Sequence, residues 1–168
     1  MNVQVLILMG SASDAAVMQA AADVLQELGV SSEMTVASAH RSPERVQRLI
    51  REAPSRGVRV FIVGAGAAAH LAGVVAAYTT LPVVGVPIDS SALHGLDALL
   101  STVQMPPGVP VATVSIGKAG ATNAGVLAAQ ILALSEPGLA RRLHDYKKSL
   151  ADNVERSEER RVGKECRL

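Results

Sequence analysis

Val3-Gln4-Val5-Leu6-Ile7-Leu8-Met9-Gly10 is a nearly unbroken apolar run that ends at a glycine, the pattern of a strand buried on both faces of a parallel sheet. A short polar turn, residues 11–14, follows. From Ala15 to Leu28 the apolar residues recur at helical spacing, and Gly29 stands where a helix cap is expected. This stretch therefore predicts one strand, one turn and one helix.

The same unit recurs along the chain. Further strands are predicted at 33–36, 58–63, 82–86 and 111–114, and further helices at 43–56, 71–78, 96–103, 122–134 and from 137 onward. Alternating strands and helices predict a parallel sheet that is covered on both faces. We therefore expect one α/β domain, residues 1–154, built as a three-layer α/β/α sandwich with a flavodoxin-like parallel sheet and a C-terminal helix.

The last residues, 155–168, are charged and polar and have no hydrophobic period, so we predict a disordered tail. Its ending, Arg160-Arg161-Val162-Gly163-Lys164-Glu165-Cys166, resembles a cloning or assembly artefact more than a part of the domain. The single cysteine, Cys166, cannot form an internal disulfide or a multi-thiolate metal site, which fits a reducing compartment.

The overall charge and hydropathy exclude several kinds of partner. Lys and Arg number 16 against 15 Asp and Glu, so the chain has no electrostatic surface that calls for nucleic acid or an anionic membrane. No apolar run reaches the roughly 20 residues that span a bilayer, and the N-terminus lacks a basic leader. We predict a cytosolic protein that binds any anion locally.

Four loops follow predicted strands, at 10–14, 37–42, 64–70 and 87–91, and should converge at the carboxyl edge of the sheet. In the first of them, the Ser11 and Ser13 hydroxyls and the backbone N–H groups can surround a phosphate at a helix N-terminus. Asp14 is a poor phosphate ligand and would instead accept hydrogen bonds from ribose hydroxyls. The alternative is that Ser13 or Asp14 only caps the helix.

The second loop, Ser38-Ala39-His40-Arg41-Ser42-Pro43, places an imidazole beside a guanidinium just before a helix. Arg offers a fixed fork of donors that suits phosphate, and histidine can shuttle protons near neutral pH. These two side chains predict an active site in which a proton carrier lies beside an anion clamp. A solvated pair of loop residues is the alternative.

The third loop, Gly64 to His70, lacks the spacing and the acidic residue of a nicotinamide-binding loop. Its small residues would let a flat ring or a CO2-sized group lie against the backbone; close helix packing is the alternative, with His70 as a capping residue. The sequence also lacks a phosphate-binding loop for ATP, a metal-ligand cluster and a nucleophile elbow. We therefore predict neither cofactor nor metal.

Several motifs together resemble one known family, the bacterial class I N5-carboxyaminoimidazole ribonucleotide mutases, which are the catalytic subunit type of phosphoribosylaminoimidazole carboxylase. The similarity spans about residues 3 to 150. It is carried by Gly10-Ser11-x-Ser13-Asp14, Ser38-Ala39-His40-Arg41-Ser42-Pro43, Gly64-Ala65-Gly66, Ala68-Ala69-His70-Leu71, Gly85-Val86-Pro87, Gly95-Leu96-Asp97-Ala98-Leu99-Leu100-Ser101, Val103-Gln104-Met105-Pro106, Gly108-Val109-Pro110-Val111 and Asn123-Ala124.

The resemblance implies conversion of N5-carboxyaminoimidazole ribonucleotide, a phosphoribosyl aminoimidazole, into 4-carboxy-5-aminoimidazole ribonucleotide without ATP or metal. It also implies a homo-octamer whose sites include residues of neighbouring subunits. His40 would be the general acid and base, and Asp14 would hold the ribose. The remaining roles would be phosphate binding by Ser11, Ser13, Ser38 and Arg41, and lining of the base and carboxyl pocket by Gly66, Ala68, His70 and Leu71.

The chain departs from the family pattern at Ala67, Ala72 and Val74, where the family usually has Gly, Pro and Met. The Ala67 methyl requires a negative φ and a side chain that faces away from the ligand. Three alternatives remain open: the class II carboxylase, which uses aminoimidazole ribonucleotide and free CO2; a non-catalytic nucleotide-binding module of flavodoxin-like type; and an oligomer scaffold packed through the small residues of the helix from Thr122 to Leu134.

Overall fold

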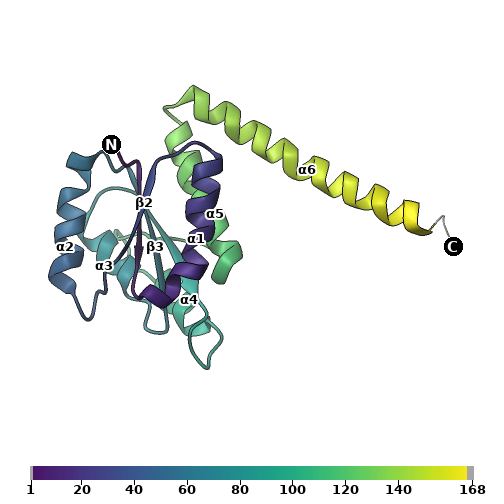
Figure 1. Ribbon diagram of the computed structural model, residues 1–168. Coiled ribbons are helices and arrows are strands. Elements are labelled where there is room, and N and C mark those ends of the chain that lie inside the picture. The colour runs from purple at the N-terminus through teal and green to yellow at the C-terminus, as the bar shows by residue number, and fades with distance from the viewer. Residues whose placement is uncertain (1, 166–168) are drawn as a thin grey trace.

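The computed structural model describes residues 2–165, and its centre is a five-stranded, all-parallel sheet (Figure 1). The strands are β1 (Val5–Met9), β2 (Ser32–Val36), β3 (Val60–Gly66), β4 (Val83–Ile88) and β5 (Ala112–Thr113), in the order β2-β1-β3-β4-β5. The chain order reverses between β1 and β3. In such a doubly wound sheet, the crevice beyond the carboxyl ends of these two strands is the usual place for a ligand.

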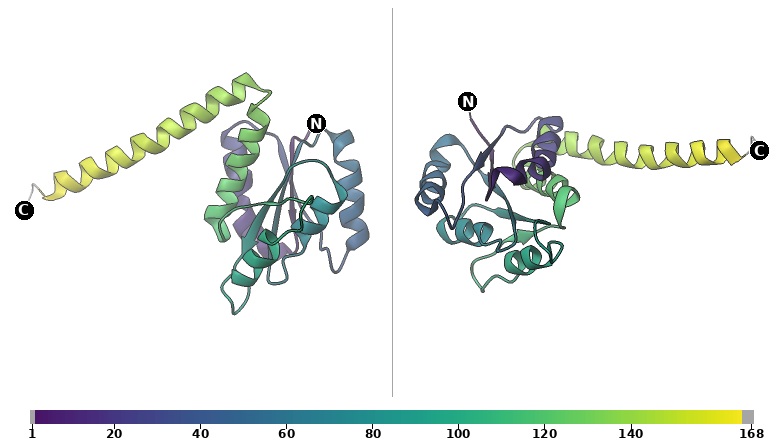
Figure 2. Two further views of the ribbon diagram at one scale, coloured as in Figure 1. Left: turned by 180° about the vertical axis from the view of Figure 1, so that it is seen from behind. Right: turned by 60° about the horizontal axis from the view of Figure 1, so that its bottom comes forward.

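Helices cover both faces of the sheet, which confirms the predicted three-layer sandwich (Figures 1 and 2). α1 (Ala15–Glu27) and α5 (Gly117–Ala133) lie on one face. α2 (Pro43–Glu52), α3 (Leu71–Tyr78) and α4 (Leu96–Val103) pack on the other. Two short 3-10 turns, η1 (Ala12–Asp14) and η2 (Pro54–Arg56), precede α1 and follow α2.

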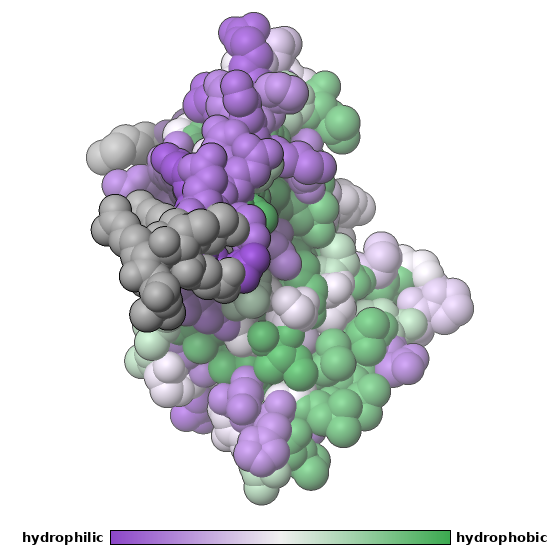
Figure 3. Space-filling view, turned by 90° about the vertical axis from the view of Figure 1, so that its right-hand side faces the viewer, coloured by the Kyte–Doolittle hydropathy of each residue, from purple (hydrophilic) through white to green (hydrophobic). Residues whose placement is uncertain are grey.

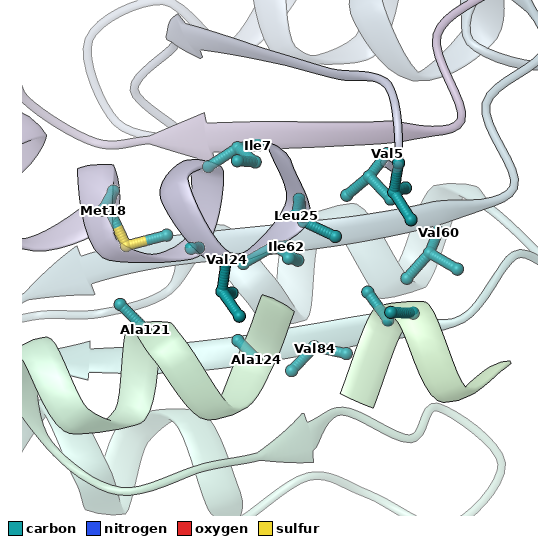
Figure 4. Packing of buried hydrophobic residues seen from close by; sticks show 14 of the residues in the cluster. Val5, Ile7, Met18, Val24, Leu25, Val60, Ile62, Val84, Ala121 and Ala124 are labelled. Carbon is teal, nitrogen blue, oxygen red and sulfur yellow. The ribbon is translucent and has the colours of Figure 1, made fainter. Parts of the chain in front are cut away.

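The residues of β1 alternate between the two layers of the core. Val5 and Ile7 pack under α1 and α5, whereas Leu6 and Leu8 belong to the cluster under α2, α3 and α4. All four are fully buried. This two-sided burial explains why β1 is apolar throughout, as the sequence predicted. Figure 4 shows the first cluster, in which α1 and α5 meet over the strands.

The small residues of α5 are used inside the chain. Ala121, Ala124 and Ala128 are fully buried in the cluster shared with α1. A side chain at Gly125 would overlap Val24 of α1, so glycine lets the two helices approach closely. The α5 residues therefore pack within one copy of the chain, and they supply no argument for the scaffold alternative.

Several element boundaries differ from the predictions by a few residues; α2, for example, ends at Glu52 rather than near 56, and two further differences lie in glycine-rich segments. The loop predicted from Gly64 is strand as far as Gly66, because β3 pairs with β4 up to Gly66 opposite Ile88. α5 begins at Gly117 rather than near Thr122. Gly120 lies in its first turns, where a side chain would overlap the Ser115 carbonyl. Close packing, rather than a loop, accounts for Gly64, Gly66 and Gly120, whereas the first residue of α5 is a glycine with a positive φ.

The last helix, α6 (Pro137–Glu165), projects away from the body of the molecule (Figures 1 and 2). Residues 155–165, where a disordered tail was predicted, form the end of this helix; the segment is rich in Glu, Arg and Lys, which favour helix, and pairs such as Glu158–Arg161 link successive turns. Cys166 lies outside the described residues. Figure 3 shows hydrophilic side chains along α6 and a hydrophobic area on the body.

Within residues 2–165, no helix is both long enough and apolar enough to cross a membrane.

Candidate active site

The four loops that were predicted to converge enclose one cavity of about 320 Å³ at the carboxyl edge of the sheet. It opens beyond β1 and β3, the point where the strand order reverses. Its lining residues are Gly10, Ser11, Ser13, Asp14, Ser38, Ala39, His40, Arg41, Ala65, Gly66, Ala68, Leu71 and Ser90. Every site residue predicted from the sequence lines this cavity except His70.

The first turn, residues 10–14, is stabilised by its own side chains. Ser11 is the N-cap of η1: its hydroxyl accepts the Ser13 N–H at 3.3 Å and the Ser13 hydroxyl at 2.8 Å. The Asp14 carboxylate accepts the Ser11 N–H at 3.1 Å, which completes a capping box. The capping alternative is therefore correct in part, but the capping residue is Ser11. The same side chains also line the cavity.

Asp14 is the one carboxylate among the cavity-lining residues, and it is only 5% exposed. Burial raises the pKa of its carboxyl group above the ordinary value, while the Ser11 N–H, the Ser13 hydroxyl and the Arg41 charge act against that rise, in that order. A carboxylate that is desolvated at a cavity wall gains from any ligand hydroxyl that donates to it.

The second loop brings Arg41 against the first. The Arg41 guanidinium donates to the Gly10 carbonyl at 3.1 Å, so its charge lies beside the serines of the first turn. The loop is fixed internally, since the Ser38 hydroxyl accepts the Arg41 N–H at 3.2 Å and the Ser42 hydroxyl accepts the Ser38 N–H at 3.0 Å. The cavity therefore contains a guanidinium and several hydroxyl groups, which suit an anion such as phosphate.

The third turn, residues 66–70, has an unusual backbone. Ala67 has φ of +49°, in the left-handed region, so the expected negative φ is wrong. The Ala69 and His70 N–H groups bond back only two residues, to the Ala67 and Ala68 carbonyls, at 2.8 Å each. The Ala67 side chain is exposed and does not line the cavity, which agrees with the expectation that it faces away from a ligand.

His40 and His70 form a hydrogen-bonded pair. His40 Nε2 lies 2.8 Å from His70 Nδ1, and the two rings meet edge to face with centroids 4.9 Å apart. His70 occupies the N-cap position of α3, but its ring makes no capping hydrogen bond and turns to His40 instead. Only one of the two facing nitrogens can carry the shared proton, so the state of one ring constrains the other. Spacing alone could not reveal this pairing across 30 residues.

Ser90 is a cavity residue that was not among the predicted site residues. It follows β4 in the loop 87–91, and this position after a strand was the only feature of the sequence that pointed to the cavity. A side chain on Gly66 would overlap the Ser90 hydroxyl and lie 3.0 Å from the Ile88 carbonyl, so glycine is required for this close approach. Ser90 therefore closes the cavity on the β4 side.

The described residues contain no group of three or more histidine, cysteine or acidic side chains that could hold a metal ion. The cavity combines the His40 imidazole, which can exchange protons, with a guanidinium and hydroxyl groups that can bind an anion and a buried carboxylate that can accept hydrogen bonds from hydroxyl groups. These groups suit acid–base chemistry on a phosphorylated sugar derivative.

Comparisons with known proteins show which family the chain resembles along most of its length. The model of the AIR carboxylase family matches residues 4–153. The chain is 54% identical to the N5-carboxyaminoimidazole ribonucleotide mutase of Bacillus subtilis, over 93% of this chain and 96% of that protein. It is 51% identical to the mutase of the same name in Escherichia coli K12, over 90% and 89%. The crystal structure of Treponema denticola PurE superimposes with a TM-score of 0.83 at 29% identity, over 94% and 97%.

Proposed function

Because this chain belongs to the AIR carboxylase family, we propose that it is an N5-carboxyaminoimidazole ribonucleotide mutase of purine biosynthesis. The observation that carries the proposal is the His40–His70 pair, whose His40 ring lines a cavity that also contains Arg41 and serine hydroxyls. Relatives of 51 to 55% identity that bear the mutase name favour this reaction over carboxylation with free CO2.

The phosphoribosyl end of the substrate would bind between the first two loops. Ser11, Ser13, Ser38 and Arg41 would hold the phosphate, since all four line the cavity and the Arg41 guanidinium lies at the Gly10 carbonyl, directly before the serines of the first turn. Asp14 would accept hydrogen bonds from the ribose hydroxyls. This division fits the charges, because the buried carboxylate repels phosphate and attracts hydroxyl donors.

The aminoimidazole and its carboxyl group would lie along the third turn. Gly66, Ala68 and Leu71 line this part of the cavity, and their small or apolar side chains leave room for a flat ring. His70 would act on this pocket through its hydrogen bond to His40. A poorly hydrated wall would help to retain CO2 during transfer.

One imidazole can supply the proton transfers that the reaction needs. When the N–C bond of the carbamate breaks, CO2 forms and the exocyclic nitrogen takes a proton from His40. When C4 then attacks CO2, a C–C bond forms and the proton on C4 returns to His40. Protons balance over the two steps, so general acid–base catalysis by a single residue suffices.

We further propose that the enzyme works in the cytoplasm as a homo-octamer. Leu96, Leu100 and Val103 are each about half exposed and fall at helical spacing on one side of α4, and Leu93, in the turn before the helix, is exposed as well. Such a surface suits contact with another copy of the chain. Light scattering would give eight times the 17.4 kDa chain mass; a monomer or a dimer at assay concentration would contradict the octamer.

The test of the activity is an assay at neutral pH without ATP or metal. The purified chain receives either N5-carboxyaminoimidazole ribonucleotide alone or aminoimidazole ribonucleotide with bicarbonate. We expect the 4-carboxy product from the first substrate and loss of that product with His40→Asn, whereas His144→Asn on α6 is the matched control. Turnover only with aminoimidazole ribonucleotide and CO2 would favour a carboxylase. Ligand binding without turnover of either substrate would indicate a binding module.

A further inference from the structure

We infer that Ser101 of α4 is a positioning residue for the His40–His70 pair, an inference that rests on the proposed function. The Ser101 hydroxyl accepts the Ala69 N–H at 3.2 Å and can donate to the Asp97 carbonyl at 2.8 Å. It thereby joins the third turn of the site to a helix that lies outside it. Ser101 is not among the cavity-lining residues, so it acts without touching the substrate.

The third turn needs such a support because its own conformation is unfavourable. Ala67 has a positive φ, which an alanine adopts only at a cost. The Ala69 N–H otherwise bonds only to the Ala67 carbonyl two residues back, and the His70 ring gives no cap to α3. A strained turn persists when its surroundings hold it in place. Among the described residues of other elements, Ser101 is the one whose side chain forms a hydrogen bond with the backbone of residues 66–70, as acceptor of the Ala69 N–H.

The position of Ala69 determines that of the histidine pair. Ala69 is 1% exposed and packs in the same core cluster as Ala98 of α4, directly before His70 in sequence. The His70 ring in turn lies 2.8 Å from His40. If the Ala69 N–H loses its external partner, the turn can shift and His70 moves with it. A displacement of about 1 Å at a catalytic group is enough to cost up to about a hundredfold in rate.

The phosphate and ribose groups bind to other loops, so the inference makes a specific kinetic prediction. Loss of the Ser101 hydroxyl should lower kcat while KM stays nearly constant. A structural defect of the whole fold would instead lower the concentration of active enzyme and the thermal unfolding temperature together.

The experiment compares Ser101→Ala with Thr102→Val in the full chain. Thr102 is the matched control, since its hydroxyl also donates to the Ala98 carbonyl, at 2.7 Å, but does not contact the third turn. We expect Ser101→Ala to lower kcat about tenfold with KM within twofold. Thr102→Val should leave both parameters within twofold. Equal losses of kcat in the two variants, or a change in KM alone, would overturn the inference.

Hydrogen–deuterium exchange separates this inference from the activity itself. Peptides that cover residues 64–74 should exchange faster in Ser101→Ala than in the parent, with no acceleration in Thr102→Val. Unchanged exchange in Ser101→Ala would overturn the positioning role whatever the assay gives. If the parent turns over neither substrate, the proposed function fails and the catalytic part of this inference fails with it, while faster exchange would still show that Ser101 holds the turn.

Discussion

Two strand-to-helix turns line the same cavity and are held in different ways. Residues 10–14 form a capping box from their own side chains, so local sequence is enough to specify that turn. Residues 66–70 carry a positive φ at Ala67, lack a side-chain cap and donate a hydrogen bond, from the Ala69 N–H, to the Ser101 hydroxyl of α4. The turn at residues 10–14 presents hydroxyl groups that can bind an anion, and the turn at residues 66–70 carries His70, which pairs with His40. The turn proposed to bind the phosphate is thus held by its own side chains, whereas the turn that carries His70 is held by a contact with another helix.

The largest effect is expected when the Arg41 guanidinium group is removed from beside the first turn. Arg41→Met removes the charge beside Gly10 and the donors to an anion, so the dissociation constant for aminoimidazole ribonucleotide should rise about 10- to 100-fold. Calorimetric titration measures this change. Arg45→Met is the control, because Arg45 donates to the Val36 carbonyl and does not line the cavity. Equal weakening in both variants would show that Arg41 has no special part in binding.

Asp14→Asn tests whether the buried Asp14 carboxylate lowers the stability of the folded chain while it contributes to ligand binding. Burial raises the pKa of Asp14 in the folded state, so between its unfolded and folded pKa values the folded chain holds more protons, and the Asp14 contribution to stability falls as pH rises. At pH 7 the free energy of unfolding of Asp14→Asn should therefore be roughly 0.5–1 kcal/mol higher than that of the parent. The gain should be smaller at pH 4, close to the pKa of the unfolded carboxyl, and should disappear only below it, where both states hold the proton.

Urea titrations of both chains at pH 4 and pH 7 give the comparison. The same replacement should weaken ligand binding about tenfold, because a neutral amide accepts hydrogen bonds less strongly. A stability difference that does not depend on pH would contradict the effect of burial on the Asp14 carboxyl.

The smallest effect concerns the third turn, residues 66–70. Ala67→Gly removes the strain of an alanine in the left-handed region. The greater freedom of glycine in the unfolded chain offsets part of this gain, so the free energy of unfolding should rise by about 0.5 kcal/mol. Ala68→Gly, in the same turn but without a positive φ, should lower stability by a similar amount. Thermal unfolding distinguishes the two. If both variants lost stability equally, Ala67 would carry no strain.

The same contrast explains what the sequence could predict. The buried run of β1 and the helical period of α1 are local patterns, and they predicted the layers and the cavity loops correctly. The cap of the first turn was predicted at Ser13 or Asp14 and lies at Ser11, and the order of the strands was not predicted. The φ of Ala67 and the place of Ser90 belong to a part of the site that contacts distant segments, α4 and β4 respectively. The His40–His70 pair joins two loops 30 residues apart, which no spacing rule could anticipate.

The central claim is that His40 and His70 act as one unit at this cavity. A double-mutant cycle on kcat with His40→Asn, His70→Asn and the double variant tests it most directly. If the two rings act together, the double variant should be no slower than His40→Asn alone. Losses that multiply, as for two independent residues, would contradict the account.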